Sequence, residues 1–288
     1  MSAPTEEQRL KHEIARLESQ LLATQAQLTS ITEATTSPSN ANPSLPSHLL
    51  LLLSDSALPL GSFAFSSGLE SYLAHHNGRA KSKETAFPSF LTLTLTSLAT
   101  TTLPYLIAAF DEPLRLQELD ETLDACTLCP VARRASVAQG KALLTLWERA
   151  LKGEVTESAA KEALQEFGRG LKRAPTPSQK EETALGFNGH FAPMWAAVTS
   201  AMGITLHESA YTFLFNHAKA VVSAAVRASV MGPYSAHGVL ASTRLRGEIE
   251  SIMNESWQVK VDDAGQGVPM CDLWVGRHEV LYSRIFNS

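Results

Sequence analysis

Few of the residue types that bind metals or carry redox chemistry lie at useful spacings in this sequence. Cys126 and Cys129 have the CxxC spacing that occurs in zinc and redox sites. The third cysteine, Cys271, is far away in the sequence, and no second pair of ligands lies at a spacing typical of zinc sites. None of the nine histidines belongs to an HExxH or HxH motif, and the neighbours His75 and His76 would point apart at a helix end. We therefore predict no metal site and no resident cofactor.

Motifs of the common enzyme classes do not occur in the sequence either. A GxxxxGK[ST] loop, which would cradle nucleotide phosphates, is missing. A GxSxG motif, which would present a nucleophilic serine, is missing too. Because no pair of carboxylates is singled out by its spacing, we predict that the protein is not an enzyme. An enzyme with an unrecognised helical active site is the remaining catalytic alternative.

The composition argues against nucleic acid and membrane as partners. The 24 basic and 29 acidic residues leave a net charge of −5, whereas a nucleic-acid binder needs a basic surface to displace counterions. The longest run of strong hydrophobes, Leu49–Leu53, is far shorter than a membrane-spanning helix. The charged start MSAPTEEQRLKHE lacks the apolar stretch of a signal peptide, and three cysteines are too few for a disulfide framework. These features indicate a cytosolic protein.

The chain divides into an N-terminal helix, a linker and one large domain. Residues 1–33 are predicted to contain a coiled-coil-like helix over 6–33, because apolar residues recur with a 4–3 spacing. The apolar seam consists of Leu10, Ile14, Leu17, Leu21, Leu28 and Ile31. A coiled coil of about three heptads is marginal, so a frayed arm is the alternative. Residues 34–47, rich in Pro, Ser, Thr and Asn, form a predicted flexible linker, and the main domain is expected at 48–288.

Helical periodicity dominates the main domain and predicts an all-α fold, a single helical bundle of about eight to ten helices. The segment 87–110 contains an alternation at Leu91, Leu93 and Leu95 that is typical of a strand, but the Leu- and Ala-rich helical segments around it favour a buried helix. Thr156 is a candidate cap for the helix that follows it. The other predicted helices are 131–151, 191–202, 206–231 and 234–257, and an exposed loop is expected at 172–182.

One segment departs from the plain helical pattern. Residues 49–73 read LLLLLSDSALPLGSFAFSSGLESYL. We expect a helix to end before an extended passage at Pro59, and a tight turn at Gly61. Phe63 and Phe65 lie in this turn region. They either staple the two flanking helices together or form a rigid apolar binding platform.

Three arginines are a second group of candidates. Arg227 lies in the apolar stretch VVSAAVRASV. It must be paired or face a polar cavity, because an unpaired buried charge is costly. Arg133 and Arg134 are expected at the solvent or at an interface.

The tail 271–288 is a candidate partner-binding element. It follows a Gly-rich loop and carries many apolar and aromatic side chains, which a free disordered end rarely does. Arg284 lies between Tyr282 and Phe286, a composition common at the centre of interfaces. We expect the tail to leave the bundle and to bind a partner; docking on its own bundle is the alternative.

Four blocks of the sequence resemble the urease accessory protein F family, in the order in which the family has them. The blocks are SDSALPLGSFAFSSGLE (54–70), VARRASVAQGKALL (131–144), the stretch from GHFAPMW to ASVMGP (189–233) and the tail HEVLYSRIFNS (278–288). Phe65 stands where the first block of the family often has Tyr, so a hydroxyl hydrogen bond is absent there. Residues 1–47 have no counterpart in the family pattern.

This resemblance implies an all-helical, dimeric scaffold without catalytic activity of its own. Proteins of the family bind the D-type accessory protein, also called H, and recruit the nickel-carrying GTPase, the G-type accessory protein. That assembly inserts nickel into apo-urease. The resemblance thus implies these three partners, a regulatory role toward the GTPase, a tail ordered against the D/H-type partner, and no hydrolysis of GTP or urea by the chain itself. The alternative from another class is a generic helical adaptor that binds through its N-terminal coil.

The candidate partner-binding residues come from the first block, the arginines and the tail. They are Pro59, Gly61, Ser62, Phe63, Phe65, Ser66, Gly68, Glu70, Arg133, Arg134, Arg227, Tyr282, Arg284 and Phe286. No residue is assigned to a catalytic, cofactor or metal site.

The predicted linker leads to a first test. Deleting residues 1–47 should leave the main domain folded, because a Pro- and Ser-rich segment buries little apolar surface. We expect the melting temperature, measured by calorimetry, to change by less than about 4 °C, which corresponds to ~1 kcal/mol in a domain of this size. A much larger fall would show that the N-terminal helix packs into the main core.

Overall fold

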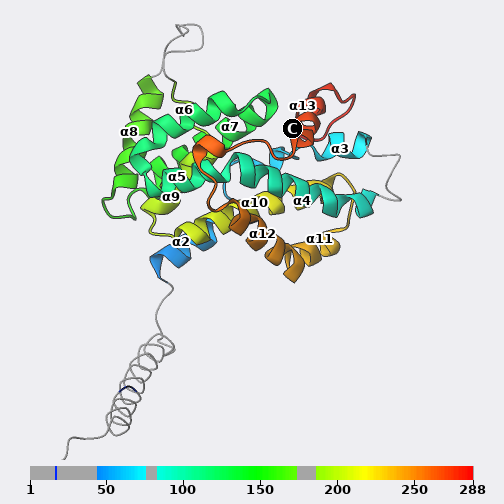
Figure 1. The fold of residues 1–288 in the computed structure, drawn as a ribbon, viewed down its shortest axis with the longest axis horizontal. Coiled ribbons are helices and arrows are strands. Elements are labelled where there is room, and N and C mark those ends of the chain that lie inside the picture. The colour runs from blue at the N-terminus through cyan, green and yellow to red at the C-terminus, as the bar shows by residue number, and fades with distance from the viewer. Residues whose placement is uncertain (1–16, 18–43, 76–82, 174–185, 288) are drawn as a thin grey trace, which may run out of the picture. The chain divides into compact units, whose positions relative to one another are not determined.

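The computed structural model describes residues 17, 44–75, 83–173 and 186–287 of the chain. Contacts divide the chain into two units, Met1–Ser44 and Leu45–Ser288, and the fold is described for the second unit (Figure 1). The predicted N-terminal helix and most of the predicted linker lie outside the described residues, as does most of the loop expected at 172–182. The last three residues of the predicted linker are helical, because helix α2 begins at Leu45.

The described part of this unit consists of helices joined by turns and contains no strand, which confirms the all-α fold class. It has twelve α-helices where eight to ten were expected, since two of the expected helices are each broken in two. The α-helices are α2 (Leu45–Leu53), α3 (Leu69–His75), α4 (Lys83–Thr101), α5 (Leu103–Asp111), α6 (Leu116–Cys126), α7 (Pro130–Leu146), α8 (Ala159–Arg173), α9 (Phe191–Ala201), α10 (Leu206–Arg227), α11 (Pro233–Leu240), α12 (Thr243–Ser256) and α13 (Pro269–Arg277). The short helices are η1 (Ser62–Ala64), η2 (Pro113–Arg115), the π-helical η3 (Trp147–Leu151), η5 (Val261–Asp263) and η6 (His278–Val280).

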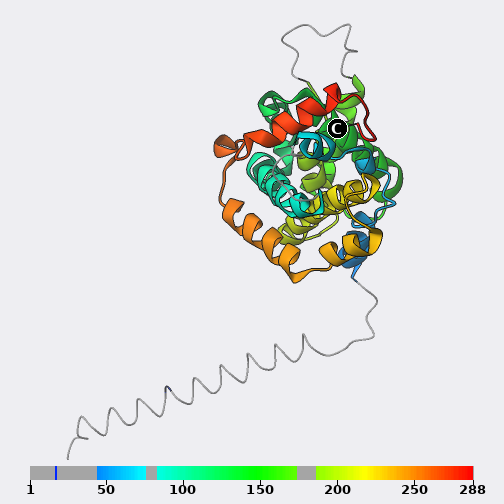
Figure 2. The same cartoon turned by 90° about the vertical axis from the view of Figure 1, so that its right-hand side faces the viewer.

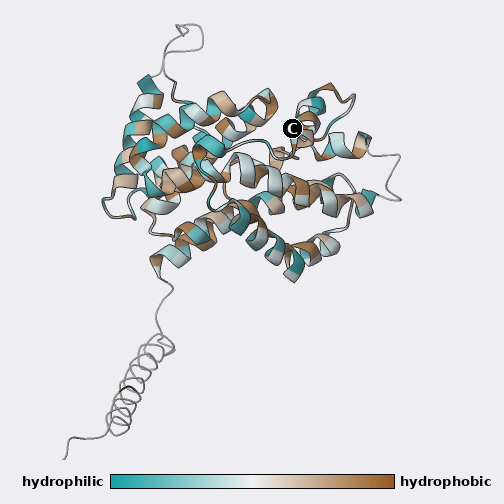
Figure 3. Ribbon diagram, in the orientation of Figure 1, coloured by the Kyte–Doolittle hydropathy of each residue, from teal (hydrophilic) through white to brown (hydrophobic). Residues whose placement is uncertain are grey.

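Helix α9 forms the centre of the core. Its residues from Ala192 to Thr199 are all buried, as in a helix that is surrounded by other helices. Helices α5, α7, α8 and α10 pack around it. The indole N–H of Trp195 donates to the carbonyl of Ser209 on α10 at 3.1 Å, so the polar group of this buried ring is paired. Figure 3 shows hydrophilic ribbon on outer helices such as α8.

The buried helix predicted over 87–110 is helical, but it is broken at Thr102 into α4 and α5. Pro104 has no N–H, so it leaves the carbonyl of Thr100 without its helical donor. The N–H of Gly265 donates to that carbonyl at 3.1 Å. The break therefore ties the loop before α13 to the middle of the bundle. None of the described helices is by itself long and apolar enough to cross a membrane; α4 and α5 together reach that length and composition, with a bend of 41° between them.

Two predicted helix boundaries differ from the structure because local caps intervene. The helix expected over 234–257 is interrupted after α11. The hydroxyl of Ser242 begins α12 by accepting the N–H of Leu245 at 3.2 Å. Likewise Ser158, and not Thr156, caps α8, since its hydroxyl accepts a backbone N–H of the first turn at 3.2 Å.

A buried carboxylate holds the N-terminal end of α9. Asp120 on α6 accepts the backbone N–H groups of Asn188 at 2.7 Å, Gly189 at 2.9 Å and His190 at 2.6 Å. Burial raises the pKa of Asp120 above its ordinary value, although these hydrogen bonds act in the opposite direction. Three donors at the start of the central helix thus depend on one side chain.

Replacing Asp120 by Ala should therefore destabilise the protein strongly. The three backbone N–H groups would lose their acceptor away from water, and we expect a loss of ~2–4 kcal/mol in the free energy of unfolding. Urea denaturation measures this loss. The matched control is Asp111→Ala, an exposed carboxylate at the end of α5, which should change stability by less than ~0.5 kcal/mol. Equal effects of the two variants would contradict the assigned role of Asp120.

Candidate partner-binding surface

The segment 54–68 of the first block forms a series of turns between α2 and α3. Asp55 Oδ1 accepts a backbone N–H two residues further on at 2.9 Å, and the N–H of Leu58 donates to the carbonyl of Asp55 at 3.2 Å. The expectation of an extended passage at the exposed Pro59 is therefore wrong, because an aspartate-stabilised turn bends the chain there. Gly61 follows with φ +73°, a left-handed conformation that leads directly into η1.

The C-terminal tail lies on its own domain, contrary to the expectation that it leaves the bundle. Helix α13 packs against α3, α4 and α7. The Trp274 ring contacts Tyr72 and Phe90 at centroid distances of 4.8 and 5.9 Å. Near the end of the chain, Phe286 is only 3% exposed. Figure 2 shows this red segment beside the cyan α3. Partner binding thus remains a prediction for those tail residues that stay exposed.

Backbone hydrogen bonds join the last tail residues to the first block. The Glu70 carboxylate on α3 accepts the N–H of Ile285 at 3.0 Å and that of Phe286 at 3.2 Å. The N–H of Asn287 donates to the carbonyl of Ala64 at 2.8 Å. Hydrogen bonds to a carboxylate are stronger than those between neutral groups, so Glu70 is the principal polar contact of the tail.

Arg227 connects three segments that lie far apart in the sequence. Helix α10 was expected to continue to residue 231 but ends at this residue. Its Nη2 donates to the carbonyl of Phe63 at 2.6 Å, and its guanidinium lies over the ring of Phe286 at 4.3 Å from the centroid. The loss of surrounding water lowers its pKa below the ordinary value. Arg227 is exposed and not buried as its apolar surroundings in the sequence suggested, and its pairing is made by a carbonyl and an aromatic ring, contacts worth roughly 0.5–1 kcal/mol each at an exposed site.

Gly68 allows the closest approach between the first block and α13. It has φ +82°, and a Cβ added there would lie 2.8 Å from the backbone nitrogen of Val275. Any side chain at this position would push α13 away from α3. Ser66, two residues earlier, is fully buried, so this part of the block faces the interior of the domain.

Arg134 and Arg284 both bind Glu279, the second residue of the tail block. Arg134 on α7 forms an ion pair with Glu279. Arg284 Nη1 donates to the backbone carbonyl of the same Glu279 at 3.2 Å. These side chains are exposed, so the ion pair itself adds little stability. Its effect is to hold charged groups in defined positions beside the tail.

Arg133 lies apart from these residues. Its guanidinium donates two hydrogen bonds to Asp124, to Oδ1 at 2.5 Å and to Oδ2 at 2.6 Å, and His190 Nε2 also lies 2.9 Å from Oδ1. Burial raises the pKa of Asp124, but the hydrogen bonds from Arg133 and His190 outweigh it, so the pKa lies below its ordinary value. Arg133 therefore connects α7 to α6 and, through Asp124, to the start of α9. This role is structural.

The docked tail and the turn leave a group of apolar side chains in solvent. Phe63 is 67% exposed, Ile285 is 63% exposed and Tyr282 is fully exposed. Together with Val280 and Arg284, which are also exposed, we call them the tail–turn surface. The backbone beneath it is held by the hydrogen bonds described above. Exposed apolar side chains on a fixed backbone are typical of a protein-binding site.

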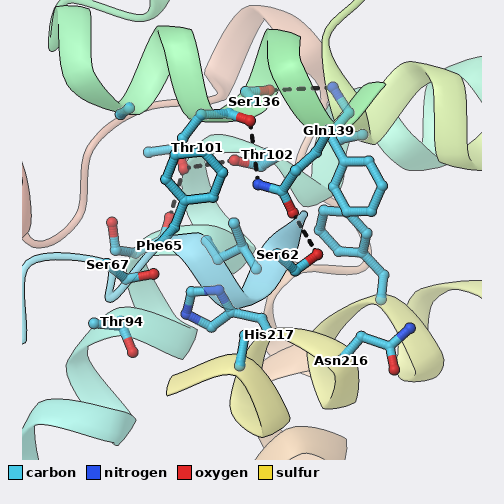
Figure 4. Close-up of a pocket in the computed structure, with 18 of the residues that line it drawn as sticks. Ser62, Phe65, Ser67, Thr94, Thr101, Thr102, Ser136, Gln139, Asn216 and His217 are labelled. Atoms are coloured by element: carbon cyan, nitrogen blue, oxygen red, sulfur yellow. Dashed lines mark hydrogen bonds between the residues drawn. The ribbon is translucent and has the colours of Figure 1, made fainter. Parts of the chain in front are cut away.

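The first block also lines a cavity of about 500 Å³ (Figure 4). Ser62 and Phe65 from this block, Gln139 from α7 and His217 from α10 form parts of its wall. The hydroxyl of Ser62 donates to Gln139 Oε1 at 2.8 Å. The cavity opens to the solvent, because the exposed residues Phe63 and Leu128 are part of its wall. Water or another molecule can therefore enter it.

The cysteines are placed differently from one another. Cys126 is exposed, whereas Cys129 and Cys271 are buried. Over the ranges that the structure describes, no group of three or more His, Cys, Asp or Glu side chains is arranged to hold a metal ion. What the described residues do offer is an exposed apolar surface and a cavity.

Three residues of this region were not predicted from the sequence. His278 is fully buried with Nε2 at 2.9 Å from the carbonyl of Phe286. Glu279 pairs with Arg134, and Gln139 holds Ser62. Each of the three is a polar residue inside a block that resembles the family, and that position is the signal that could have identified them.

Arg227→Met should loosen the tail while leaving the core intact. Met keeps a long apolar side chain but removes both the hydrogen bond to Phe63 and the cation over Phe286. We expect the amide hydrogens of residues 285–287 to exchange roughly tenfold faster, and those of α9 to exchange at the original rate. Hydrogen-exchange mass spectrometry reads both regions at once. Arg244→Met, at an exposed arginine of α12, is the matched control and should leave the tail unchanged.

Comparison with known proteins finds relatives over most of the chain. A family model described as UreF matches residues 81–244. The "Uncharacterized urease accessory protein UreF-like" of Schizosaccharomyces pombe is 38% identical over 245 residues, which cover 84% of this chain and 97% of the relative. "Urease accessory protein 6" of Cryptococcus neoformans is 28% identical over 317 residues, with 84% and 96% covered. "Urease accessory protein UreF" of Paenarthrobacter aurescens is 31% identical over 241 residues, with 82% and 95% covered. The resemblance seen in the four blocks is thereby confirmed, and the chain belongs to the UreF family of urease accessory proteins.

Proposed function

We propose that this urease accessory protein is a cytosolic, non-catalytic scaffold for other urease maturation factors. Together with the D/H-type accessory protein it recruits the nickel-carrying G-type GTPase, and the assembly inserts nickel into apo-urease. It acts as a homodimer within that assembly and regulates the GTPase. Residues 1–33 are a separate coiled-coil arm on the linker in this proposal. The names of the relatives, which are urease accessory proteins, support it.

The observation that carries the proposal is the tail–turn surface. Tyr282 is fully exposed, yet the residues that follow it are bonded to Glu70 and Ala64. An aromatic side chain on a fixed backbone loses little conformational entropy when it binds, so it is well suited to the centre of an interface. The D/H-type protein is assigned to this surface because the resemblance implies that this partner contacts the tail.

The charges beside the tail define how a partner would be oriented. The Arg284 side chain is exposed and keeps donors available for a carboxylate on the partner. Its neighbours Tyr282 and Ile285 supply the apolar contact area. An arginine among exposed apolar side chains combines affinity with specificity, because it rejects partners that lack an acceptor at that point.

Substitutions on this surface test the proposal directly. Tyr282→Ala and Arg284→Ala should each weaken binding of the D/H-type accessory protein by about tenfold or more, as expected for central interface residues. Biolayer interferometry with the purified full-length chains measures the affinity. Both variants should keep their melting temperature, because neither side chain is buried.

Tyr234→Ala is the matched control for this experiment. Tyr234 on α11 is 92% exposed, like Tyr282, but lies outside the tail–turn surface. Its replacement should leave the affinity unchanged. The proposal fails if Tyr282→Ala binds as tightly as the original chain. Loss of the partner only on deletion of residues 1–33 would instead favour the generic adaptor.

A further inference from the structure

The polar side chains that line the 500 Å³ cavity are mostly bonded within the protein. Ser62 is paired with Gln139, and Ser136 lies 3.0 Å from His190 Nδ1. The others with internal hydrogen bonds are Thr94, Ser97, Thr101, Thr102, Thr127 and Asn216. The donors of these groups are thus used inside the protein, and what they leave for water or a ligand are mainly acceptor positions.

Apolar side chains fill the spaces between these bonded groups. Phe65, Leu98, Phe213 and Val275 line the cavity from four different elements of the fold. The wall therefore presents mainly carbon to the interior. A concave apolar site with a small number of free polar groups is the usual form of a small-molecule site, for which this volume is typical.

Few charged side chains line the cavity. The charged side chains among its lining residues are Asp55, Lys219 and Asp272. Asp55 is exposed at the edge, and the Lys219 ammonium is already bonded to a backbone carbonyl and to Asn216 Oδ1. Burial raises the pKa of the Cys271 thiol to about 11, so this group is protonated. A charged ligand bound among the apolar side chains would lose its hydration, which costs free energy.

His217 differs from the other polar residues of the wall, because one of its ring nitrogens has no hydrogen-bond partner among the described residues. Figure 4 shows its ring pointing from α10 toward the centre of the cavity. Its Nε2 has no hydrogen-bond partner among the residues that the structure describes and is itself buried, so a ligand can pair with it only if the ring turns slightly. Burial lowers the pKa of the imidazole to about 4, so the ring is neutral at pH 7. A neutral imidazole carries one donor and one acceptor, and leaving a buried one unpaired is costly.

From these observations we propose that the cavity binds one neutral organic molecule with an apolar body and a hydrogen-bonding group that pairs with His217. The apolar body occupies the space between Phe65, Leu98 and Phe213. The hydrogen-bonding group is a hydroxyl or amide, because such groups match an uncharged imidazole. Phe63 of the tail–turn surface also lines this cavity, but the side chains that would bind the molecule lie outside that surface, so the site does not depend on the proposed scaffold function.

N-phenyl-1-naphthylamine is a suitable probe, since it is neutral, has an N–H donor and fluoresces in apolar surroundings. We expect its fluorescence to rise and saturate at one molecule per full-length chain. Three compounds with the same ten-carbon chain then test the charge preference. 1-Decanol should displace the probe, whereas decanoate and decylammonium should do so at least about tenfold less well. Equal displacement by all three, or no saturable binding of the probe, would overturn the proposal.

Variants locate the probe in the cavity. Ala220→Trp on α10 and Ala135→Trp on α7 fill the cavity from two walls and should abolish binding. The control Ala241→Trp, at an exposed alanine, should bind normally. His217→Leu should weaken binding roughly fivefold through the lost hydrogen bond, while His237→Leu, at an exposed histidine, should not. Circular dichroism identifies any variant that fails to fold, and a crystal structure of the original chain with the probe then decides the location. Binding that persists in a folded cavity-filling variant, or a probe found elsewhere, contradicts the proposal.

Discussion

Helix α9 is enclosed by other helices, and this constraint organises the rest of the domain. The N–H groups at the start of a buried helix need acceptors inside the protein, because water does not reach them. Asp120 supplies the acceptor from α6, and Asp124 with Arg133 extends the polar contact to α7. On its other side α9 packs against α10, which carries Arg227 to the place where turn and tail meet. The place where turn and tail meet is thus positioned by the core through two helices, α9 and α10.

The turn and the last residues of the tail stabilise each other, because several of their contacts are shared. Ordering each residue costs chain entropy, which a single hydrogen bond does not offset. Glu70 binds two backbone N–H groups of the tail, and Arg227 contacts both Phe63 and Phe286. These contacts share residues, so they form and break together. The exposed side chains above them are held in place only as long as the whole set is intact.

The all-α class is predictable from the sequence because the period of apolar residues reports which side of a helix is buried. The alternation at Leu91, Leu93 and Leu95 indicates a strand, although this segment is a helix. The reason is that α4 is buried on more than one side, so apolar residues occupy positions that fit a period of two as well as the helical period. Docking of the tail is not predictable, since the bonds to Glu70 come from backbone N–H groups that every residue type has. The cavity is not predictable either, because it results from packing between segments that are distant in the sequence.

Thr100 binds the loop before α13 a second time, because its hydroxyl accepts the N–H of Gly267 at 3.3 Å, and this bond has a consequence for the order in which the domain folds. It joins residues 167 positions apart, and the contact of Glu70 with Phe286 spans 216 positions. Helices form far faster than contacts of such separation, and the C-terminal end of a chain leaves the ribosome last. We therefore expect α4, α5 and α10 to assemble before the loop and α13 close over them. Until that final step a nascent chain exposes Tyr72 and Phe90, the aromatic rings that Trp274 later covers, and is open to aggregation or to a chaperone.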